Sequence, residues 1–522
     1  MRKSTLGVTG GVMRKGGPNP QRMAQDDPFH ADPGEPGFEQ IPLSLLPAAT
    51  HPGHPAQLAR PYLLASGLLC GYNANRGLRT GGVETTVVPD DDGHTNHPRP
   101  RVLNQKGTIP TMQALVFRYS MPRFAFARLF GVLTPRAFLS FGGPTQLEEI
   151  PEPELLGDEW TIVRTARCGI CGSDVKQVFL NANFDNPLTT LISFPQVLGH
   201  EAVGVIEHVG PGVKARQVGE RVVVNPWLSC GPRGIEPPCD ACQRGQYSLC
   251  VHFTDGDLPP GMHAGNSRAV TGGYAPLLPV HESQLFPIPD GVTFDQAVLA
   301  DPFSVSLHAI LKAPPAEGAW ALVYGAGVLG LLSIAVLRAL YPAARVAVVA
   351  RYPHQAELAR QLGAERVIRT RNPAEVVESV AEMVGARVYR PGRGLPWLLR
   401  GVDVIYDTVG TAETLEVGVR LTNPRAPIVI TGVGAPARFE WTPLYFKEVM
   451  LLGSNAFGVE EVGGQRLHGM EHYLRLMRRG KLELSSLVTH RFRLEQYQEA
   501  FLAMHTKARH GAVKAVFDFE LS

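Results

Sequence analysis

Short apolar runs alternate with amphipathic, helix-like stretches through the second half of this chain. Strand-like runs lie at Ala321–Tyr324, Arg345–Ala350, Arg366–Ile368, Val402–Asp407 and Pro427–Thr431. One helix-like stretch ends at Leu340, and two others cover His354–Leu362 and Glu413–Leu421. Repeated strand–helix units of this kind favour an α/β fold built on a parallel, doubly wound sheet.

One stretch in this region, Gly318–Leu337, has 20 residues without a charge. That length is sufficient for a membrane-spanning helix. The alternative is a buried strand, a glycine turn and a buried helix. It is favoured because a second strand-like run, Arg345–Ala350, follows at once. We therefore expect no membrane span.

The beginning of the chain has a different composition. Residues 1–110 contain 15 Gly and 14 Pro, about 26% of the segment, which is at the threshold of disordered composition. The segment also has no apolar core of a secretory signal, so we expect a cytoplasmic protein. Residues 1–111 are expected to be a disordered or non-native extension, with Met112 as a candidate start.

Length and charge limit the classes of protein further. The 522 residues favour at least two folded domains, and a net charge of +2 gives no argument for a nucleic-acid partner.

Seven cysteines occur, and six of them lie between Cys168 and Cys250. Clustered cysteines in a chain without a secretory signal indicate metal binding or catalysis rather than disulfides. Four thiolates at short spacing suit a closed, tetrahedral structural zinc site, and these are Cys230, Cys239, Cys242 and Cys250. The alternative is a set of unconnected buried cysteines.

A second group of candidate ligands is spread more widely. Cys168-Gly-Ile-Cys171 resembles a redox motif, but its surroundings favour one ligand of an open zinc site. His200-Glu201 lies between two apolar flanks, and Asp301 follows an apolar run where a carboxylate would be costly to bury without a partner. A zinc ion would be such a partner.

A glycine motif, Gly325-Ala-Gly327-Val328-Leu329-Gly330, ends the first strand of the predicted parallel sheet. It also opens a helix, which is the setting in which such a loop binds the pyrophosphate of a dinucleotide. At the end of the next strand, Ala350 replaces the acid typical of NAD sites and Arg351 follows. This favours NADP, with NAD as the alternative.

These motifs together resemble the zinc-dependent medium-chain dehydrogenase/reductase family, which includes alcohol, polyol and threonine dehydrogenases. The resemblance covers about four fifths of the chain, and its most specific parts are Gly169–Asp174, Gly199–Glu201, the four cysteines and the glycine loop. It implies a GroES-like, mainly-β catalytic domain followed by a Rossmann domain. The expected boundaries are 112–302 for the catalytic domain, with a structural-zinc lobe at 230–250, 303–452 for the nucleotide-binding domain, and 453–522 for a return to the catalytic domain.

The resemblance also implies roles for individual residues. Cys171, His200 and Asp301 would bind a catalytic zinc, with Glu201 as an exchangeable carboxylate, and Cys230, Cys239, Cys242 and Cys250 would bind a second, structural zinc. Ser173 would start a proton relay, and Asp174 would lie behind the metal ligands. Gly325, Gly327, Val328, Leu329, Gly330, Arg351, Thr431 and Lys514 would bind the cofactor.

The implied activity is hydride transfer between an alcohol, aldehyde or ketone and a nicotinamide cofactor, in a homo-oligomer, either a dimer or a tetramer. Two alternatives stay open: a zinc-independent quinone or enoyl reductase of the same superfamily, and a non-catalytic nucleotide-binding protein. Three departures from the family are apparent. They are six extra residues between Cys230 and Cys239 and apolar or longer insertions at Arg123–Gly143 and Ala386–Arg400. The first insertion is compatible with a lid, an oligomer contact or a membrane-surface helix.

Deletion of residues 1–111 should leave folding and activity nearly unchanged. The segment contains too little apolar surface to offset the entropy of ordering it. Soluble yield, melting temperature and turnover of the truncated and full-length chains provide the comparison, and a large fall in any of them would contradict the expectation.

Overall fold

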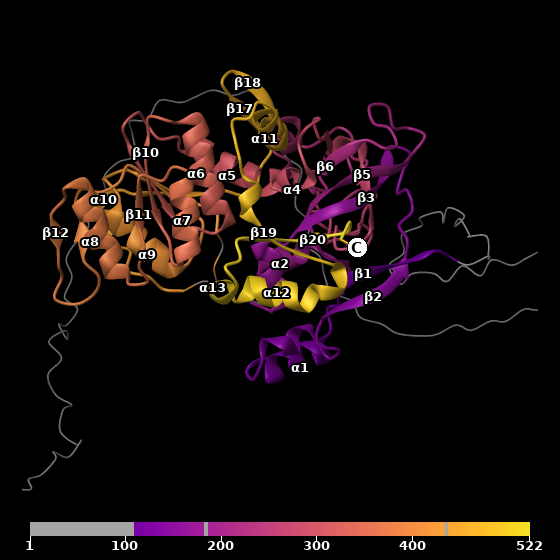
Figure 1. Cartoon of the computed structure of the whole chain (residues 1–522), viewed down its shortest axis with the longest axis horizontal. Coiled ribbons are helices and arrows are strands. Elements are labelled where there is room, and N and C mark those ends of the chain that lie inside the picture. Colours follow the sequence, from indigo (N-terminus) through magenta and orange to yellow (C-terminus); the bar gives the residue numbers. More distant parts are fainter. Residues whose placement is uncertain (1–108, 182–185, 433, 435–436, 522) are drawn as a thin grey trace, which may run out of the picture. The chain divides into compact units, whose positions relative to one another are not determined.

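The computed structural model describes residues 109–181, 186–432, 434 and 437–521. The extension expected at 1–111 lies almost entirely outside the described residues. Within the described part, the α/β fold class is confirmed, with a mainly antiparallel sheet and a six-stranded parallel sheet (Figure 1).

The antiparallel part combines strands from residues 111–287 with the last two strands of the chain, at residues 488–518. Seven strands form its main sheet: β3 (Trp160–Gly169), β5 (Glu201–Val209), β6 (Arg221–Val224), β7 (Leu277–His281), β8 (Leu285–Pro287), β19 (Val488–Phe492) and β20 (Lys514–Asp518). β3 pairs with β5, β7 and β20. The chain therefore returns to this sheet after the parallel one, and the domain boundaries stay a prediction. A smaller sheet contains β1 (Thr111–Phe117), β2 (Thr145–Pro151) and β4 (Gln196–Val197).

The parallel sheet has the order β11-β10-β9-β14-β15-β16, which is the doubly wound order of dinucleotide-binding folds. Its strands are β9 (Trp320–Tyr324), β10 (Arg345–Val349), β11 (Arg366–Ile368), β14 (Val404–Asp407), β15 (Pro427–Ile430) and β16 (Met450–Gly453). Alternate residues of β9 belong to two different hydrophobic cores, Ala321 and Val323 to one and Leu322 and Tyr324 to the other. The sheet is therefore buried on both faces.

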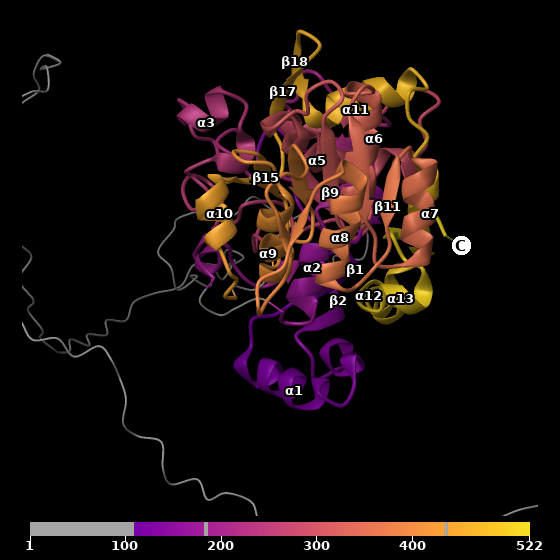
Figure 2. The same ribbon diagram turned by 90° about the vertical axis from the view of Figure 1, so that its left-hand side faces the viewer.

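Helices cover these two faces. Side chains of α5 (Ala300–Lys312), α6 (Val328–Leu340), α7 (Pro353–Gln361) and α11 (Gly469–Arg478) join the first core, and those of α8 (Pro373–Val384) and α9 (Ala412–Leu421) join the second (Figure 2). The uncharged stretch Gly318–Leu337 forms β9, the glycine turn and most of α6. Among the described residues, no helix has both the length and the apolarity that a membrane crossing requires.

The remaining helices and strands are short or lie in connections. They are α1 (Met121–Gly131), α2 (Gly172–Val178), α3 (Asp240–Gln243), α4 (Phe294–Ala297), α10 (Thr442–Lys447), α12 (Tyr497–His505), α13 (Lys507–His510) and the hairpins β12 (Val388–Tyr389)–β13 (Trp397–Leu398) and β17 (Val459–Val462)–β18 (Gln465–His468). The Ala386–Arg400 insertion contains the β12–β13 hairpin, and its Trp397 ring meets Phe446 of α10 edge to face at 5.7 Å.

The Arg123–Gly143 insertion contains most of α1 and a short 3-10 turn. Phe124 and Leu139 are buried in the core of the antiparallel part, and the Leu139 carbonyl accepts hydrogen bonds from Tyr497 and Gln498. Leu133 and Phe141 are exposed, at 80% and 88%. The insertion is thus anchored at its base and apolar at its surface, and the three roles considered for it stay open.

Arg233 lies in the lengthened segment between Cys230 and Cys239 and gives this segment a structural role. Its side chain is fully buried, and its guanidinium donates hydrogen bonds to five carbonyl oxygens, of Leu228, Asp255, Leu258, Pro259 and Gly261. Burial lowers the pKa of Arg233 to about 10, which still leaves it charged at neutral pH. The extra residues therefore provide a cation that ties the cysteine lobe, residues 230–250, to the loop that follows it.

Arg233→Met should lower the free energy of unfolding by about 3 kcal/mol or more, because several buried carbonyl groups lose their donor. Urea unfolding provides the measurement. Arg244→Lys, at an exposed position of the same lobe, is the control and should change the free energy by less than about 0.5 kcal/mol. Equal effects of the two substitutions would show that Arg233 does not hold the lobe together.

Candidate active site

Three strands of the antiparallel sheet bring the candidate metal ligands together. β5 pairs with β3 so that Glu201 lies opposite Gly169, and β20 pairs with β3 so that Val516 also lies opposite Gly169. Cys171 follows the end of β3, His200 precedes β5, and Lys514 begins β20. Residues far apart in the chain therefore meet at one end of the sheet.

Cys171, His200 and Glu201 form a compact group in which the candidate ligand atoms all lie within 4.8 Å of one another. Asp301 is not part of this group. It lies in the first turn of α5, buried beside the group, where burial and the charge of Glu201 raise its pKa to about 7. His200 and Lys514 oppose this rise in the pKa of Asp301, and its role as the third zinc ligand stays a prediction.

Asp174 supports both Cys171 and His200 from the first turn of α2. Its Oδ2 accepts hydrogen bonds from the Cys171 backbone N–H at 3.1 Å and the Tyr274 hydroxyl at 2.7 Å, and its Oδ1 lies 3.5 Å from His200 Nδ1. Burial opposes the charge of Asp174, but His200, Tyr274 and Cys171 lower its pKa below the ordinary value. Asp174 on the Nδ1 side leaves His200 Nε2 for a metal.

Tyr274 is a part of the site that sequence reasoning missed. It is fully buried, and a Cβ at Gly199 would lie 2.5 Å from its ring. Gly199 has a φ of +95°, so the residue before His200 must be glycine for both conformation and space. The only local signal was an aromatic residue directly after the pair Gly272-Gly273.

Lys514 lies at the metal-ligand group. Its fully buried amine donates hydrogen bonds to the carboxylate of Glu201 and to the Ile170 carbonyl. Burial disfavours its charge, but Glu201 and Cys171 raise its pKa above the ordinary value. A Cβ at Gly169 would lie 2.1 Å from Glu201 Oε2, so this glycine makes room for the pair. The structure thus gives Lys514 a carboxylate partner, and its predicted contact with the cofactor stays a prediction.

Ser173, the expected start of the proton relay, lies in the first turn of α2 and is exposed. Its hydroxyl can therefore be reached from solvent two residues from Cys171. The position is compatible with a relay between the metal group and water.

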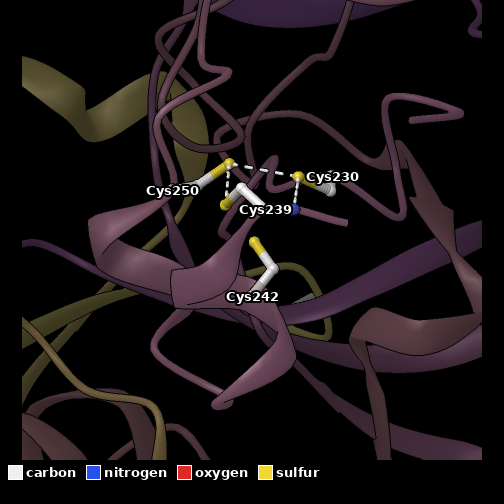
Figure 3. A group of neighbouring side chains, drawn as sticks. All are labelled: Cys230, Cys239, Cys242 and Cys250. Atoms are coloured by element: carbon white, nitrogen blue, oxygen red, sulfur yellow. Dashed lines mark hydrogen bonds between the residues drawn. The ribbon is translucent and has the colours of Figure 1, made fainter. Parts of the chain in front are cut away.

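The four cysteines of the lobe converge (Figure 3). Sγ of Cys250 lies 3.7 Å from that of Cys230 and 4.0 Å from that of Cys239. A zinc tetrahedron with bonds of about 2.3 Å has sulfur–sulfur edges of about 3.8 Å. Hydrogen bonding from Cys250 is the main factor that lowers the pKa of Cys242 to about 5. The donor set and its spacing therefore fit zinc, and Cys230, the ligand beside the longer gap, has the position that a fourth ligand needs.

The glycine loop has the geometry that its motif predicts. Gly325 has a φ of +99°, Gly327 caps α6, and a Cβ at Gly330 would lie 1.9 Å from the Gly325 carbonyl oxygen. Val328 and Leu329 form the first turn of α6, where free backbone N–H groups favour an anion. Thr431 follows β15, and its backbone N–H and hydroxyl donate to the Asp407 carbonyl at the end of β14. Arg351 follows β10 and is exposed.

Two protein-family models match this chain. The alcohol dehydrogenase GroES-like domain matches residues 157–290, and the zinc-binding dehydrogenase domain matches residues 328–465. The first match covers β3 to β8 with Cys171, His200 and Glu201, and the second begins at the first residue of α6 and covers β10 to β16.

Named relatives agree with this assignment. The chain is 32% identical to L-idonate 5-dehydrogenase of Vitis vinifera over 364 residues, which covers 68% of this chain and 87% of the relative. It is 30% identical to (R,R)-butanediol dehydrogenase of Saccharomyces cerevisiae over 328 residues, covering 60% and 80% of the two chains. The crystal structure of 2R,3R-butanediol dehydrogenase from Bacillus subtilis superposes with a TM-score of 0.56 and 25% identity, over 78% of this chain and 99% of that one. The fold, the paired metal-ligand groups and these similarities together show that the chain belongs to the zinc-type medium-chain dehydrogenase family.

Proposed function

We propose that this protein is a zinc-dependent oxidoreductase that transfers a hydride between an alcohol or polyol and a nicotinamide cofactor. The observation that carries the proposal is the group formed by Cys171, His200 and Glu201, in a chain that also has a complete nucleotide-binding glycine loop. The named relatives, an idonate and a butanediol dehydrogenase, support an alcohol or polyol as the substrate class.

The chain's own residues have distinct roles in this proposal. When bound, zinc would supply Lewis-acid polarisation of the substrate oxygen, and the nicotinamide would accept or donate the hydride. Cys171, His200 and Asp301 would hold the catalytic metal. Ser173 would pass the substrate's proton towards solvent, since its hydroxyl is exposed next to the ligand group.

Charged neighbours would hold the side chains of the metal-ligand group in place. Asp174 orients His200 through Nδ1, and Lys514 holds Glu201. Residues that hydrogen-bond to metal ligands in this way fix the orientation of the ligands and keep them in the required protonation state. The structural zinc would be the second ion of the chain, bound by the four cysteines of the lobe.

Two further properties belong to the proposal. The first is a cytoplasmic location, which stays as expected from the sequence. A homo-oligomer is supported by β16, an edge strand of the parallel sheet, where Met450 and Leu451 are exposed at 47% and 39%, close in the chain to the exposed Tyr445 and Phe446 of α10. Among the described residues no further strand pairs with this edge, and an open edge with apolar side chains is a ready site for a second copy.

The cofactor preference is proposed to be NADP. Arg351 follows β10, and Arg369 and Arg371 follow the neighbouring parallel strand β11. The Arg371 guanidinium lies 5.5 Å from the centre of the Tyr352 ring, which keeps a cation near the end of β10. The carboxyl ends of these two strands thus carry three arginines, in the region where the family's fold places the adenosine ribose.

Metal analysis and a substrate screen test the function directly. The purified protein should contain two zinc ions and should reduce or oxidise the cofactor with alcohols, polyols or aldehydes, followed by the absorbance of the reduced nicotinamide. Activity without zinc would favour the quinone or enoyl reductase alternative, and zinc without any turnover would favour a non-catalytic protein.

The two metal groups should separate by mutation. Cys239→Ser should lower the free energy of unfolding by about 3 kcal/mol or more, because a closed thiolate site contributes folding energy. Cys171→Ser should abolish turnover and leave the fold largely intact. Cys168→Ala, which alters the same four-residue motif but not a candidate ligand, should retain both ions. Zinc content, urea unfolding and turnover are compared, and two ions in all three variants would contradict the ligand assignment.

Arg351→Ile should lower kcat/KM for NADP by about tenfold to a hundredfold, because a charge-assisted hydrogen bond contributes roughly 1.5–3 kcal/mol. The value for NAD should change much less, and adding Ala350→Asp should move the preference towards NAD by repelling the 2′-phosphate. Arg393→Ile, at an exposed position of the Ala386–Arg400 insertion, is the control. A wild-type preference for NAD would show that the end of β10 was interpreted wrongly.

A further inference from the structure

His263 lies directly beside a candidate metal ligand but is a member of neither metal-ligand group. Its ring centre is 4.8 Å from that of His200, and it meets the Trp227 ring edge to face at 5.8 Å. The residue is only partly buried. A polar side chain in contact with a metal ligand, yet reachable, is in a position to touch a substrate held there.

The backbone around His263 is held firmly. Its N–H donates to Asn266 Oδ1 at 3.0 Å, and it forms an isolated antiparallel bridge with Trp227. Two residues later, a Cβ at Gly265 would lie 3.1 Å from the Gly199 carbonyl oxygen, so this loop packs closely against the residue that precedes His200. The position of the imidazole next to His200 is therefore built into the loop.

Hydrogen bonding fixes the tautomer of this imidazole. Nδ1 lies 2.7 Å from the Ala264 carbonyl oxygen, which can only accept a hydrogen bond, so Nδ1 carries the proton. In the neutral ring the other nitrogen, Nε2, then has a free lone pair and acts as an acceptor. His263 thus offers an acceptor rather than a donor beside the metal-ligand group.

We propose that His263 Nε2 accepts a hydrogen bond from a substrate hydroxyl adjacent to the reacting carbon, so that it selects vicinal diols and polyols over simple monoalcohols. The inference rests on the proposed function. A substrate with a second hydroxyl satisfies the acceptor, whereas a monoalcohol displaces water from Nε2 without replacing its hydrogen bond. Sites built to pair with a substrate hydroxyl discriminate against analogues that lack it for this reason.

The test compares 2,3-butanediol with 2-butanol, which differ by one hydroxyl group. The wild-type protein should favour the diol in kcat/KM. His263→Phe keeps an aromatic ring against His200 and Trp227 but removes the acceptor, and it should lower the diol-to-monoalcohol ratio by about tenfold. His263→Gln can place an amide oxygen near the position of Nε2 and should restore the ratio to within about threefold of the wild-type value. A structural role would not produce this rescue.

A second measurement does not depend on activity. ¹⁵N NMR of histidine-labelled protein, with the signal assigned by its loss in His263→Gln, should show the proton on Nδ1. A proton on Nε2, or an unchanged diol-to-monoalcohol ratio in His263→Phe with normal zinc content, would overturn the inference and leave the proposed function standing. Absence of turnover with every alcohol in the zinc-loaded wild type would overturn the proposed function, and this inference with it.

Discussion

The pairing of β3 with β5 is the constraint on which the active site depends. Its register puts Gly169 opposite Glu201, and this places Cys171 just beyond one strand and His200 just before the other. A shift of one residue would turn alternate side chains to the opposite face and separate the ligands. The glycine at 169 is part of the same constraint, because any side chain there would displace the Glu201 carboxylate.

Burial of charge sets the second requirement. The carboxylates of Asp174, Glu201 and Asp301 are all buried at this end of the sheet, together with the Lys514 amine. Asp174 is stabilised by neutral donors and by His200, and Glu201 by Lys514. The pKa of Asp301 is raised by burial and by Glu201, although His200 and Lys514 act in the opposite direction. A divalent cation bound at this end of the sheet would favour the charged form of Asp301.

The cysteine lobe shows how an insertion can be accommodated without loss of the site. Extra residues between Cys230 and Cys239 lengthen the first ligand spacing, yet the sulfur atoms still approach one another at tetrahedral distances. Arg233, one of these residues, donates to five carbonyl oxygens, most of them in the loop after the lobe. That loop continues to His263, so the lobe and the loop beside the metal-ligand group share one support.

Local sequence patterns determined much of this protein. The alternation of apolar runs and helical stretches predicted the parallel sheet, the glycine spacing predicted the loop before α6, and clustered cysteines predicted the lobe, because each feature is encoded within a few tens of residues. The tertiary structure alone decided which distant groups meet. Tyr274 reaches Asp174 across 100 positions and Lys514 reaches Glu201 across 313, and neither contact has a local signal. The same holds for Arg233, a residue type usual at the surface, which is buried here and joins the lobe to the following loop by hydrogen bonds. It also holds for His263, whose position beside His200 follows from loop packing. Periodicity and spacing specify elements, whereas the partners of a buried polar group are fixed only when strand pairing brings remote segments together.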